Sequence, residues 1–343
     1  MTKMDYKTTI NDIAKLVGFS VTTVSRVMNE KGDKYRISKK TQEKIKTIAT
    51  DLNYVPNLFA ANLKSGRSHT VALIIPSLNN PFFAGIASKV NSEIRRYGYT
   101  SIISDSNEDE EIEKRDLNNL ISRNIEGIII APCGDKIEHL KQISNSGIPV
   151  ICIDRYSEDV DLPYVSTDNY YGAFMATKHL IENGHRHIAC IQGVSKSTPN
   201  KLRVKGFIDA MIEAKLQDYI VVGDDFSMQN GYIETKILLQ SKKRPTAMFL
   251  LSNTIALGCL KALKEENIKI PDEISLITFD FNPFQDYLAT PLTCIGQPTD
   301  DISKISVKFL FANIHKKALT NQKILLRPEI LLRESVKNIT SHY

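Results

Sequence analysis

The sequence lacks any apolar run long enough to cross a membrane, and its polar, lysine-containing N-terminus lacks the apolar segment of a secretory signal. It has only five cysteines, which are scattered and form neither a CxxC pair nor a Cys/His ligand spacing. Disulfides and metal sites are therefore disfavoured, and reduced core cysteines are expected. We expect a cytoplasmic protein with no metal and no cofactor.

Catalytic signatures are also missing. The chain contains no GxGxxG, GxxxxGK[ST], GxSxG or HExxH motif, and each of these marks a common class of nucleotide-binding or hydrolytic enzyme. His179, His185 and His187 lie near a helix end and a strand start, where helix-dipole or surface roles are favoured over metal ligation. We therefore expect a protein that is not an enzyme.

Charge is distributed unevenly along the 343 residues. Up to His69 there are thirteen Lys and Arg against six Asp and Glu, a formal charge of +7, which leaves −2 for the remainder of a chain whose total is +5. A basic head on a slightly acidic body is typical of a protein that meets phosphate at one end only. A solvated lysine-rich helix would give the same count, so charge alone does not establish DNA binding.

The periodicity of the head predicts two helices joined by a tight turn. Thr9 is a plausible N-cap for a helix that buries Ile13 and Val17, and residues 18–20 (GFS) interrupt it. Ser20 then caps a second helix that carries hydroxyl groups and Arg26 on its open face. A generic helical bundle explains the periodicity, but it does not explain this hydroxyl-rich face or the basic helix that follows it.

From His69 onward, short apolar runs alternate with helical-period stretches, which predicts two lobes with parallel sheets and helices on both faces. The expected strands are residues 71–75, 101–103, 127–130 and 150–153, then 188–191, 219–222, 247–251 and 275–279. The expected helices are residues 83–97, 110–123, 170–183, 202–214, 229–240 and 254–267. With the head, this gives a mixed α/β chain of more than one domain.

Polar and aromatic side chains follow several of these strands, at the edge where α/β sheets bind ligands. Residues 80–83 (NPFF), Asp154 with Arg155, Asn253 and Asp280 occupy such positions. Rings beside carboxylates and a guanidinium suit a neutral polyhydroxylated ligand. Each polar residue could instead be a loop or cap residue, and one of Phe82 and Phe83 could belong to the core.

Three runs in the head resemble the LacI/GalR family of bacterial transcription regulators: residues 9–14 (TINDIA), 20–29 (SVTTVSRVMN) and 52–57 (LNYVPN). The remainder is similar to the sensor domain of that family and to periplasmic ribose-binding proteins, through residues 80–83, 154–155, 202–207 (LRVKGF), 252–253, 279–280 and 297–298. The resemblance covers residues 8–333. Residues 30–37 are longer and more charged than in many members, and Thr254 stands where many relatives carry Asp.

The resemblance implies roles for particular residues. It assigns base-reading positions to Val21, Thr22 and Arg26, phosphate contacts to Ser25 and Asn29, and minor-groove insertion at a palindromic operator to a hinge helix with Ala60, Leu63 and Lys64. The full set of expected DNA contacts is completed by Thr9, Thr23, Tyr54 and Asn57. The expected sugar-contacting residues are Asn80, Phe82, Phe83, Asp154, Arg155, Arg203, Asn253, Asp280 and Gln297.

These expectations combine into a homodimeric, DNA-binding repressor whose operator affinity changes when a neutral monosaccharide binds between the core lobes. We expect a DNA-binding domain at residues 1–55, a hinge and linker at 56–68, the sensing and dimerisation core at 69–334 and a tail at 335–343. An exported sugar-binding protein would share the core, but it would carry an export signal and would have no basic head, whereas this sequence shows the opposite.

Overall fold

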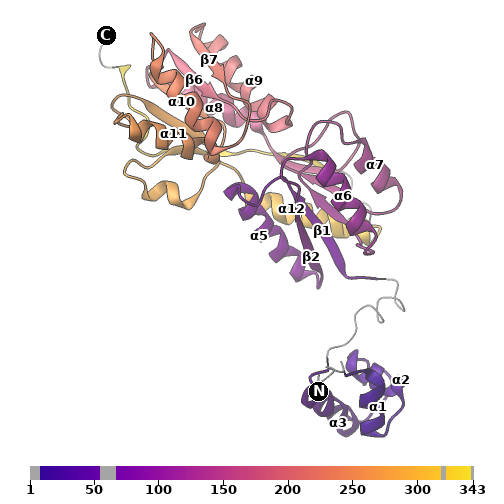
Figure 1. Ribbon diagram of the computed structural model, residues 1–343. Coiled ribbons are helices and arrows are strands. Elements are labelled where there is room, and N and C mark those ends of the chain that lie inside the picture. Colours follow the sequence, from indigo (N-terminus) through magenta and orange to yellow (C-terminus); the bar gives the residue numbers. More distant parts are fainter. Residues whose placement is uncertain (1–7, 55–66, 318–321, 341–343) are drawn as a thin grey trace, which may run out of the picture. The chain divides into compact units, whose positions relative to one another are not determined.

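The computed structural model describes residues 8–54, 67–317 and 322–340. The chain divides into two compact units, Met1–Ser68 and His69–Tyr343, each with its own core (Figure 1). No helix within the described ranges is long and apolar enough to span a membrane.

The N-terminal unit contains three helices, α1 (Ile10–Val17), α2 (Val21–Met28) and α3 (Lys39–Asp51). Thr9 forms a capping box with Asp12, and Gly18 ends α1 at φ +74°, a left-handed conformation that suits glycine. Ser20 caps α2 through the backbone N–H of Thr23. The predicted helix-turn-helix is therefore confirmed. Its buried core consists of Ile13, Ala14, Val17, Val24, Val27, Ile45 and Ala49.

The first lobe of the core is a parallel sheet in the order β11-β5-β4-β3-β1-β2. Its strands are β1 (Thr70–Ile75), β2 (Thr100–Asp105), β3 (Ile128–Ile130), β4 (Val150–Ile153), β5 (Tyr164–Thr167) and β11 (Lys323–Leu326). Its helices are α5 (Pro81–Arg96), α6 (Glu110–Ile121), α7 (Glu138–Asn145) and α12 (Thr299–Ile314). Alternate residues of a strand point to opposite faces of the sheet. Because the central strands are continuous apolar runs, both faces of the sheet are apolar, and both are covered by helices.

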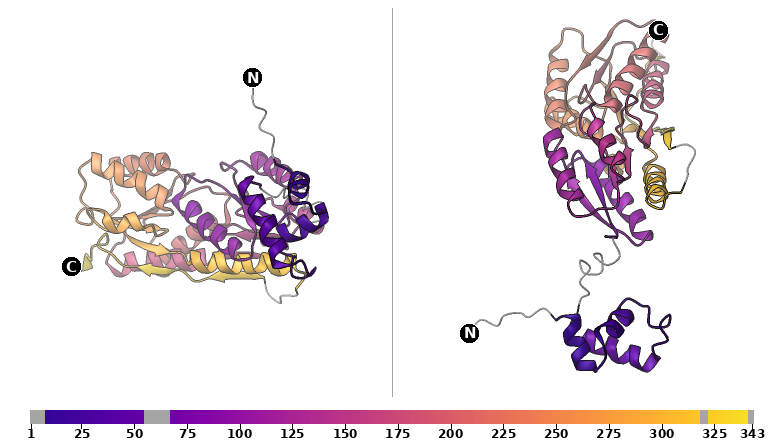
Figure 2. Two further views of the ribbon diagram at one scale, coloured as in Figure 1. Left: turned by 90° about the horizontal axis from the view of Figure 1, so that it is seen from below. Right: turned by 90° about the vertical axis from the view of Figure 1, so that its right-hand side faces the viewer.

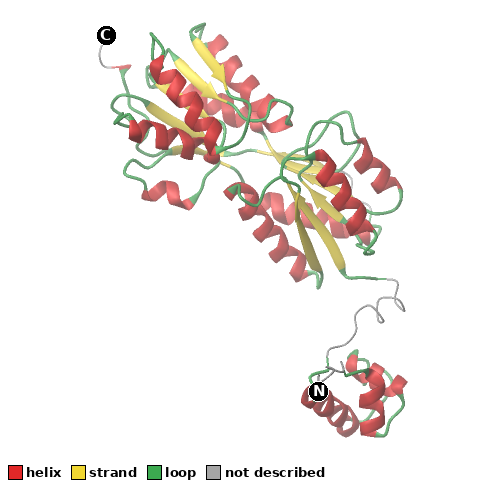
Figure 3. Cartoon of the chain, viewed as in Figure 1, coloured by secondary structure: helices red, strands yellow, loops and turns green. Residues whose placement is uncertain are grey.

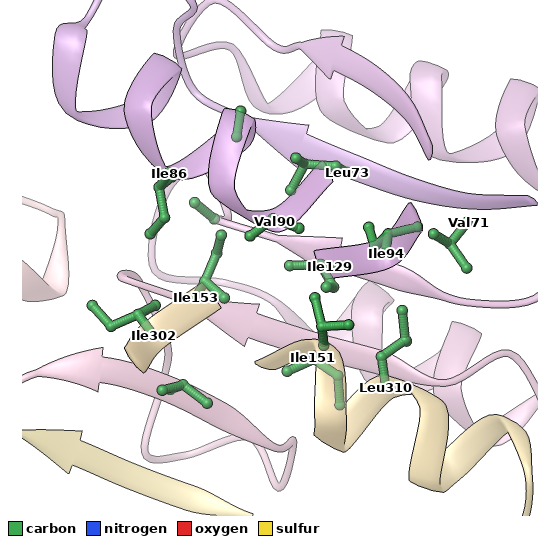
Figure 4. Close-up of a cluster of buried hydrophobic side chains, with 14 of the residues drawn as sticks. Val71, Leu73, Ile86, Val90, Ile94, Ile129, Ile151, Ile153, Ile302 and Leu310 are labelled. Atoms are coloured by element: carbon green, nitrogen blue, oxygen red, sulfur yellow. The ribbon is translucent and has the colours of Figure 1, made fainter. Parts of the chain in front are cut away.

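The face of this sheet shown in Figure 4 is covered by α5 and α12. Ile302 and Leu310 of α12 pack near Ile151 and Ile153 of β4, while Ile86, Val90 and Ile94 come from α5. The opposite face is covered by α6 and α7 through Leu117, Leu120 and Leu140.

The second lobe repeats this plan with the order β12-β10-β9-β8-β6-β7. Its strands are β6 (Ile188–Ile191), β7 (Tyr219–Val222), β8 (Ala247–Leu250), β9 (Ser275–Phe279), β10 (Thr293–Gly296) and the antiparallel β12 (Glu329–Leu331). One face packs against α8 (Asn169–Glu182) and α9 (Thr198–Glu213), the other against α10 (Met228–Gln240) and α11 (Asn253–Glu265) (Figure 3). Ser335 is buried and donates a hydrogen bond to the Leu276 carbonyl, so the chain beyond β12 stays attached to this lobe.

All eight strands predicted from the sequence are present, and their grouping into two sets of four is confirmed. The chain also returns between the lobes, which sequence reasoning did not foresee. After β10 in the second lobe it enters α12, which packs in the first (Figure 2). Elements β5, α7, β10, α12, β11 and β12 were not predicted.

Candidate functional site

The carboxyl ends of strands from both sheets surround a cavity that is partly open to solvent; its empty space is about 280 Å³ when the adjoining open solvent is included. It is lined by Asn80, Phe82, Phe83, Asp154 and Arg155 from the first lobe and by Pro199, Arg203, Phe226, Ser252 and Asp280 from the second. Seven of the nine residues expected to contact a ligand therefore line one cavity.

Asp154 and Asp280 occupy equivalent places in the two lobes, immediately after β4 and β9. Both adopt the left-handed conformation, at φ +60° and +73°, and both are buried. Such a conformation is uncommon outside glycine and persists where the surrounding structure enforces it. Each sheet thus directs one carboxylate to the edge that faces the other lobe.

The two carboxylates differ in their hydrogen bonding. Gln297 Nε2 donates to Asp280 Oδ1 at 2.6 Å, whereas Asp154 Oδ1 has no hydrogen-bond partner within the described parts of the chain. Burial raises the pKa of Asp154 to about 6, although Arg203 and Arg155 act against this rise. Burial also raises the pKa of Asp280, opposed by Arg203 and by the Gln297 hydrogen bond. Asp154 Oδ1 is therefore a buried acceptor that a ligand donor could satisfy.

Arg155 forms an ion pair with Glu108, a residue that the sequence did not predict to belong to the site. Its Nη1 and Nη2 both donate to the Glu108 carboxylate at 2.6 Å, and the Arg155 side chain is only 4% exposed. Burial tends to lower the pKa of Arg155, but the Glu108 hydrogen bonds and charge outweigh it and the pKa is raised. Arg155 is therefore charged, and its charge is matched by Glu108.

Arg203 is also engaged by the protein. Its Nε donates to Asn169 Oδ1 and its Nη1 to the Leu251 carbonyl, both at 2.7 Å, while Nη2 lies 4.0 Å from Asp280 Oδ1. The guanidinium carbon sits 3.7 Å from the centroid of the Phe279 ring, a cation–π arrangement. Arg203 also lines the cavity, with Asp280 beside it.

Asn253 and Gln297, the other two expected residues, do not line the cavity but contact Asp280. The Asn253 backbone N–H hydrogen-bonds to the Asp280 carboxylate, and Gln297 also accepts a hydrogen bond from Thr167. The Asn253 side chain is buried, and neither its oxygen nor its nitrogen has a partner in the described residues. Both residues therefore hold the Asp280 carboxylate in place rather than line the cavity themselves.

The aromatic pair has a double role. Phe82 and Phe83 are in edge-to-face contact with centroids 5.1 Å apart, and Phe83 is 3% exposed and belongs to the first-lobe core. Both also line the cavity. The core interpretation and the ligand interpretation of Phe83 are thus compatible, because one edge of a buried ring can form part of a cavity wall.

Sequence reasoning missed Pro199, Phe226 and Ser252 of the lining, as well as Glu108. Phe226 and Ser252 follow β7 and β8, so the strand-end rule that found Asp280 would also have found them. Thr254 Oγ1 donates to the Phe226 carbonyl at 2.8 Å, so the residue that departs from the family pattern fixes the Phe226 loop.

The open face of α2 carries the residues expected to meet DNA. Val21 and Thr22 are exposed, whereas Val24 and Val27 are buried. Asn29 Nδ2 donates to the Ser25 carbonyl, and the Arg26 guanidinium stacks on the Tyr35 ring at 3.8 Å. The Thr9 side chain caps α1, and Tyr54 packs partly against the head core. Asn57, Ala60, Leu63 and Lys64 lie outside the described residues.

All five cysteines are buried and free, and within residues 8–54, 67–317 and 322–340 no cluster of His, Cys, Asp and Glu is placed to hold a metal ion. The expected surface role of two histidines is wrong, because His185 and His187 are buried in the second lobe. His185 hydrogen-bonds to Thr246 and to the Lys337 carbonyl, which ties the last residues to the lobe.

Comparison with known proteins adds to this geometry. Residues 9–57 match the family model "Bacterial regulatory proteins, lacI family", and residues 68–292 match "Periplasmic binding proteins and sugar binding domain of LacI family". The chain is 33% identical to the HTH-type transcriptional regulator DegA of Bacillus subtilis, over 98% of this chain and 100% of that protein. It is also 33% identical to the repressor PurR of Vibrio parahaemolyticus, over 96% and 99% of the two chains.

Solved structures agree with these matches. The lac repressor dimer bound to operator and the anti-inducer ONPF superposes with a TM-score of 0.86 at 25% identity, covering 97% of this chain and 100% of that one. The relatives are transcriptional regulators rather than enzymes. The chain belongs to the LacI family of bacterial regulatory proteins, and it is a DNA-binding transcriptional repressor with a ligand-binding core.

Proposed function

We propose that a small neutral sugar is the effector of this repressor and that it binds in the cavity between the two core lobes. The observation that carries this proposal is the state of the charges around the cavity. Asp154 and Asp280 present two buried carboxylates, while Arg155 is paired with Glu108 and Arg203 is held by Asn169 and Leu251.

An anionic ligand would be repelled by these carboxylates and would have to be desolvated without a free cation to receive it. Hydroxyl groups avoid both costs, because they donate to carboxylates and accept from guanidinium N–H groups without carrying charge. Phe82, Phe83 and Phe226 supply apolar surface for the C–H faces of a sugar ring. The cavity therefore favours a neutral ring with several hydroxyl groups.

A pentose is the first ligand to test. The chain is 33% identical to the ribose operon repressor of Halalkalibacterium halodurans over 96% of its length and 97% of that protein. A LacI-family regulator from Enterococcus faecium with bound ribose superposes with a TM-score of 0.73 at 26% identity, covering 79% of this chain and 100% of that one. These likenesses support ribose as the probe.

On the DNA side, we propose that a homodimer binds a palindromic operator in the cytoplasm. Val21, Thr22 and Arg26 meet base edges, and the phosphate contacts come from Ser25 and Asn29. Thr9, Thr23, Tyr54 and Asn57 support this interface, and the hinge residues Ala60, Leu63 and Lys64 enter the minor groove. In this proposal residues 1–55 form the DNA-binding domain and residues 56–68 the hinge and linker. Residues 69–334 form the sensing and dimerisation core, and residues 335–343 are the tail.

Calorimetry on the full chain tests the effector class. Ribose or another neutral monosaccharide should bind, and Asp280→Ala should weaken binding by roughly 10- to 100-fold, because hydrogen bonds to a charged group contribute about 1.5–3 kcal/mol. Asp301→Ala, which removes an exposed carboxylate at the start of α12, is the control and should leave the affinity unchanged. Tight binding of a purine base or a sugar phosphate, unaffected by Asp280→Ala, would contradict the proposal.

A further inference from the structure

The Glu108–Arg155 pair lies beside the cavity and was not anticipated from the sequence. The Arg155 side chain is 4% exposed and that of Glu108 is 32% exposed, so the pair joins the buried cavity wall to the outer loop of the first lobe. Two parallel N–H to oxygen contacts at 2.6 Å make it bidentate. Bidentate arginine–carboxylate pairs fix orientation as well as charge.

This pairing leaves donors for a ligand while it removes the attraction for an anion. A guanidinium has five N–H donors, of which the Glu108 carboxylate takes one from each terminal nitrogen. The remaining N–H groups can still donate to hydroxyl oxygens. The fork that would otherwise receive a phosphate or carboxylate, however, is already occupied by Glu108.

The backbone places Glu108 for this contact. Asn107 and Glu108 both adopt the left-handed conformation, at φ +51° and +57°, in the turn between β2 and α6. The Glu108 N–H donates to the Pro76 carbonyl at 2.9 Å, and the Asn107 N–H donates to Asp105 Oδ1. Two successive residues in this sparsely populated region indicate a turn held by its surroundings, not a free loop.

Without Glu108 the charge around the cavity would change. The charges of Arg203, Arg155, Asp280 and Glu108 all affect the ionisation of Asp154. Together with Asp154 they make three carboxylates and two guanidiniums around the cavity. Replacing Glu108 by a neutral residue leaves two of each and frees the fork of Arg155. Arg203 would still be held by Asn169, Leu251 and Asp280.

We propose that Glu108 is a specificity-determining residue: it positions Arg155 for hydroxyl groups and cancels its charge, so that anions are excluded from the cavity. The inference rests on the proposed function for the identity of the neutral ligand. The exclusion of anions by Glu108 does not depend on that identity, because it concerns the affinity of the same cavity for a simple anion such as phosphate.

The test compares two ligands on the Glu108→Gln variant of the full chain. Glutamine keeps the size of the side chain but removes the charge and one acceptor. The affinity for ribose should fall by about tenfold, since Arg155 loses the bidentate ion pair that orients it. Inorganic phosphate should begin to bind, and its affinity should rise at least about tenfold over the wild type. Opposite changes for the two ligands are the signature, because a purely structural defect would lower both.

Three further variants sharpen the result. Glu111→Gln removes an exposed carboxylate that is paired with Lys114 on α6 and should change neither affinity. Glu108→Asp keeps the charge and should exclude phosphate as the wild type does, even if Glu108→Gln fails to fold. Adding Arg155→Gln to Glu108→Gln should abolish the new phosphate binding.

Each outcome decides a separate question. Phosphate binding by Glu108→Asp, or no gain of phosphate binding by folded Glu108→Gln relative to Glu111→Gln, would overturn the role of Glu108. If the wild-type chain bound no neutral monosaccharide, the proposed function would fail, but the phosphate titrations would still decide whether Glu108 excludes anions.

Discussion

Asp154 is a buried carboxylate that lacks a donor for one oxygen in the described structure, and this makes it sensitive to both ligand and pH. Burial raises its pKa to about 6 because the charged form is poorly solvated, and the charges of Arg203 and Arg155 limit that rise. Ligand hydroxyl groups that donate to Asp154 would favour the ionised form. Ligand binding and ionisation of Asp154 are therefore expected to support each other.

We predict that ribose affinity rises with pH between about 5 and 7. Below the pKa of about 6, Asp154 holds a proton that must be released before the carboxylate can accept from the sugar, so affinity should fall up to roughly tenfold per pH unit. Calorimetry across this range checks the trend, and Asp154→Asn should flatten it. Affinity that increases as the pH falls would show that the protonated acid binds the ligand.

The residue scale also shows where sequence reasoning stops. Asp154 and Asp280 were found because each directly follows an apolar strand. Glu108 lies in residues 107–111 (NEDEE), an acidic run that is typical of the solvated start of a helix. Its contact with Arg155 depends on positive φ angles in the turn and on two strands that are distant in sequence, β2 and β4, which no local pattern specifies.

At the scale of elements, the segment between α2 and α3 is an ordered part of the head. Lys39 and Gln42 both bond to the Asp33 carboxylate at 2.8 Å, and Gly32 is buried so close to Gln42 that a Cβ would collide with that side chain. This loop brings Tyr35 over Arg26. The longer, more charged loop noted in the sequence therefore packs against α2, the helix proposed to read DNA.

We predict that Tyr35→Ala lowers the preference for operator over random DNA by about two- to fivefold, because an exposed cation–π contact contributes about 0.5–1 kcal/mol. Tyr35→Phe keeps the ring and should keep the preference. Fluorescence anisotropy on both DNAs at one salt concentration measures the ratio. Equal losses on operator and random DNA would instead assign Tyr35 a contact with the phosphate backbone.

Elements with a strong local period were predictable, and those fixed by tertiary pairing were not. The fully buried strands β4 and β6 read as continuous apolar runs. By contrast, β11 and β12 are only partly buried and pair far along the chain with β5 and β10. The helical pattern of α12 carries no sign that it packs against β3 and β4 in the other lobe.

At the scale of the whole molecule, the core is built so that a small ligand can act on both lobes. Each sheet contributes one carboxylate and part of the cavity wall, and segments of the chain pass between the lobes near β5, β10 and β11. A ligand that binds one arrangement of the lobes more tightly shifts the population toward it. In the proposed function, that shift changes the affinity of the head for DNA.

The most direct measurement of this account is operator affinity with and without ribose, on the full chain and on Asp280→Ala, at fixed salt and with an operator selected from random DNA. Saturating ribose should change the wild-type operator affinity by about 5- to 150-fold, the usual range of allosteric coupling, in either direction. Asp280→Ala should bind the operator but lose this response. Unchanged operator affinity at saturating ribose, or a response only to a purine or a sugar phosphate, would contradict control by a neutral sugar.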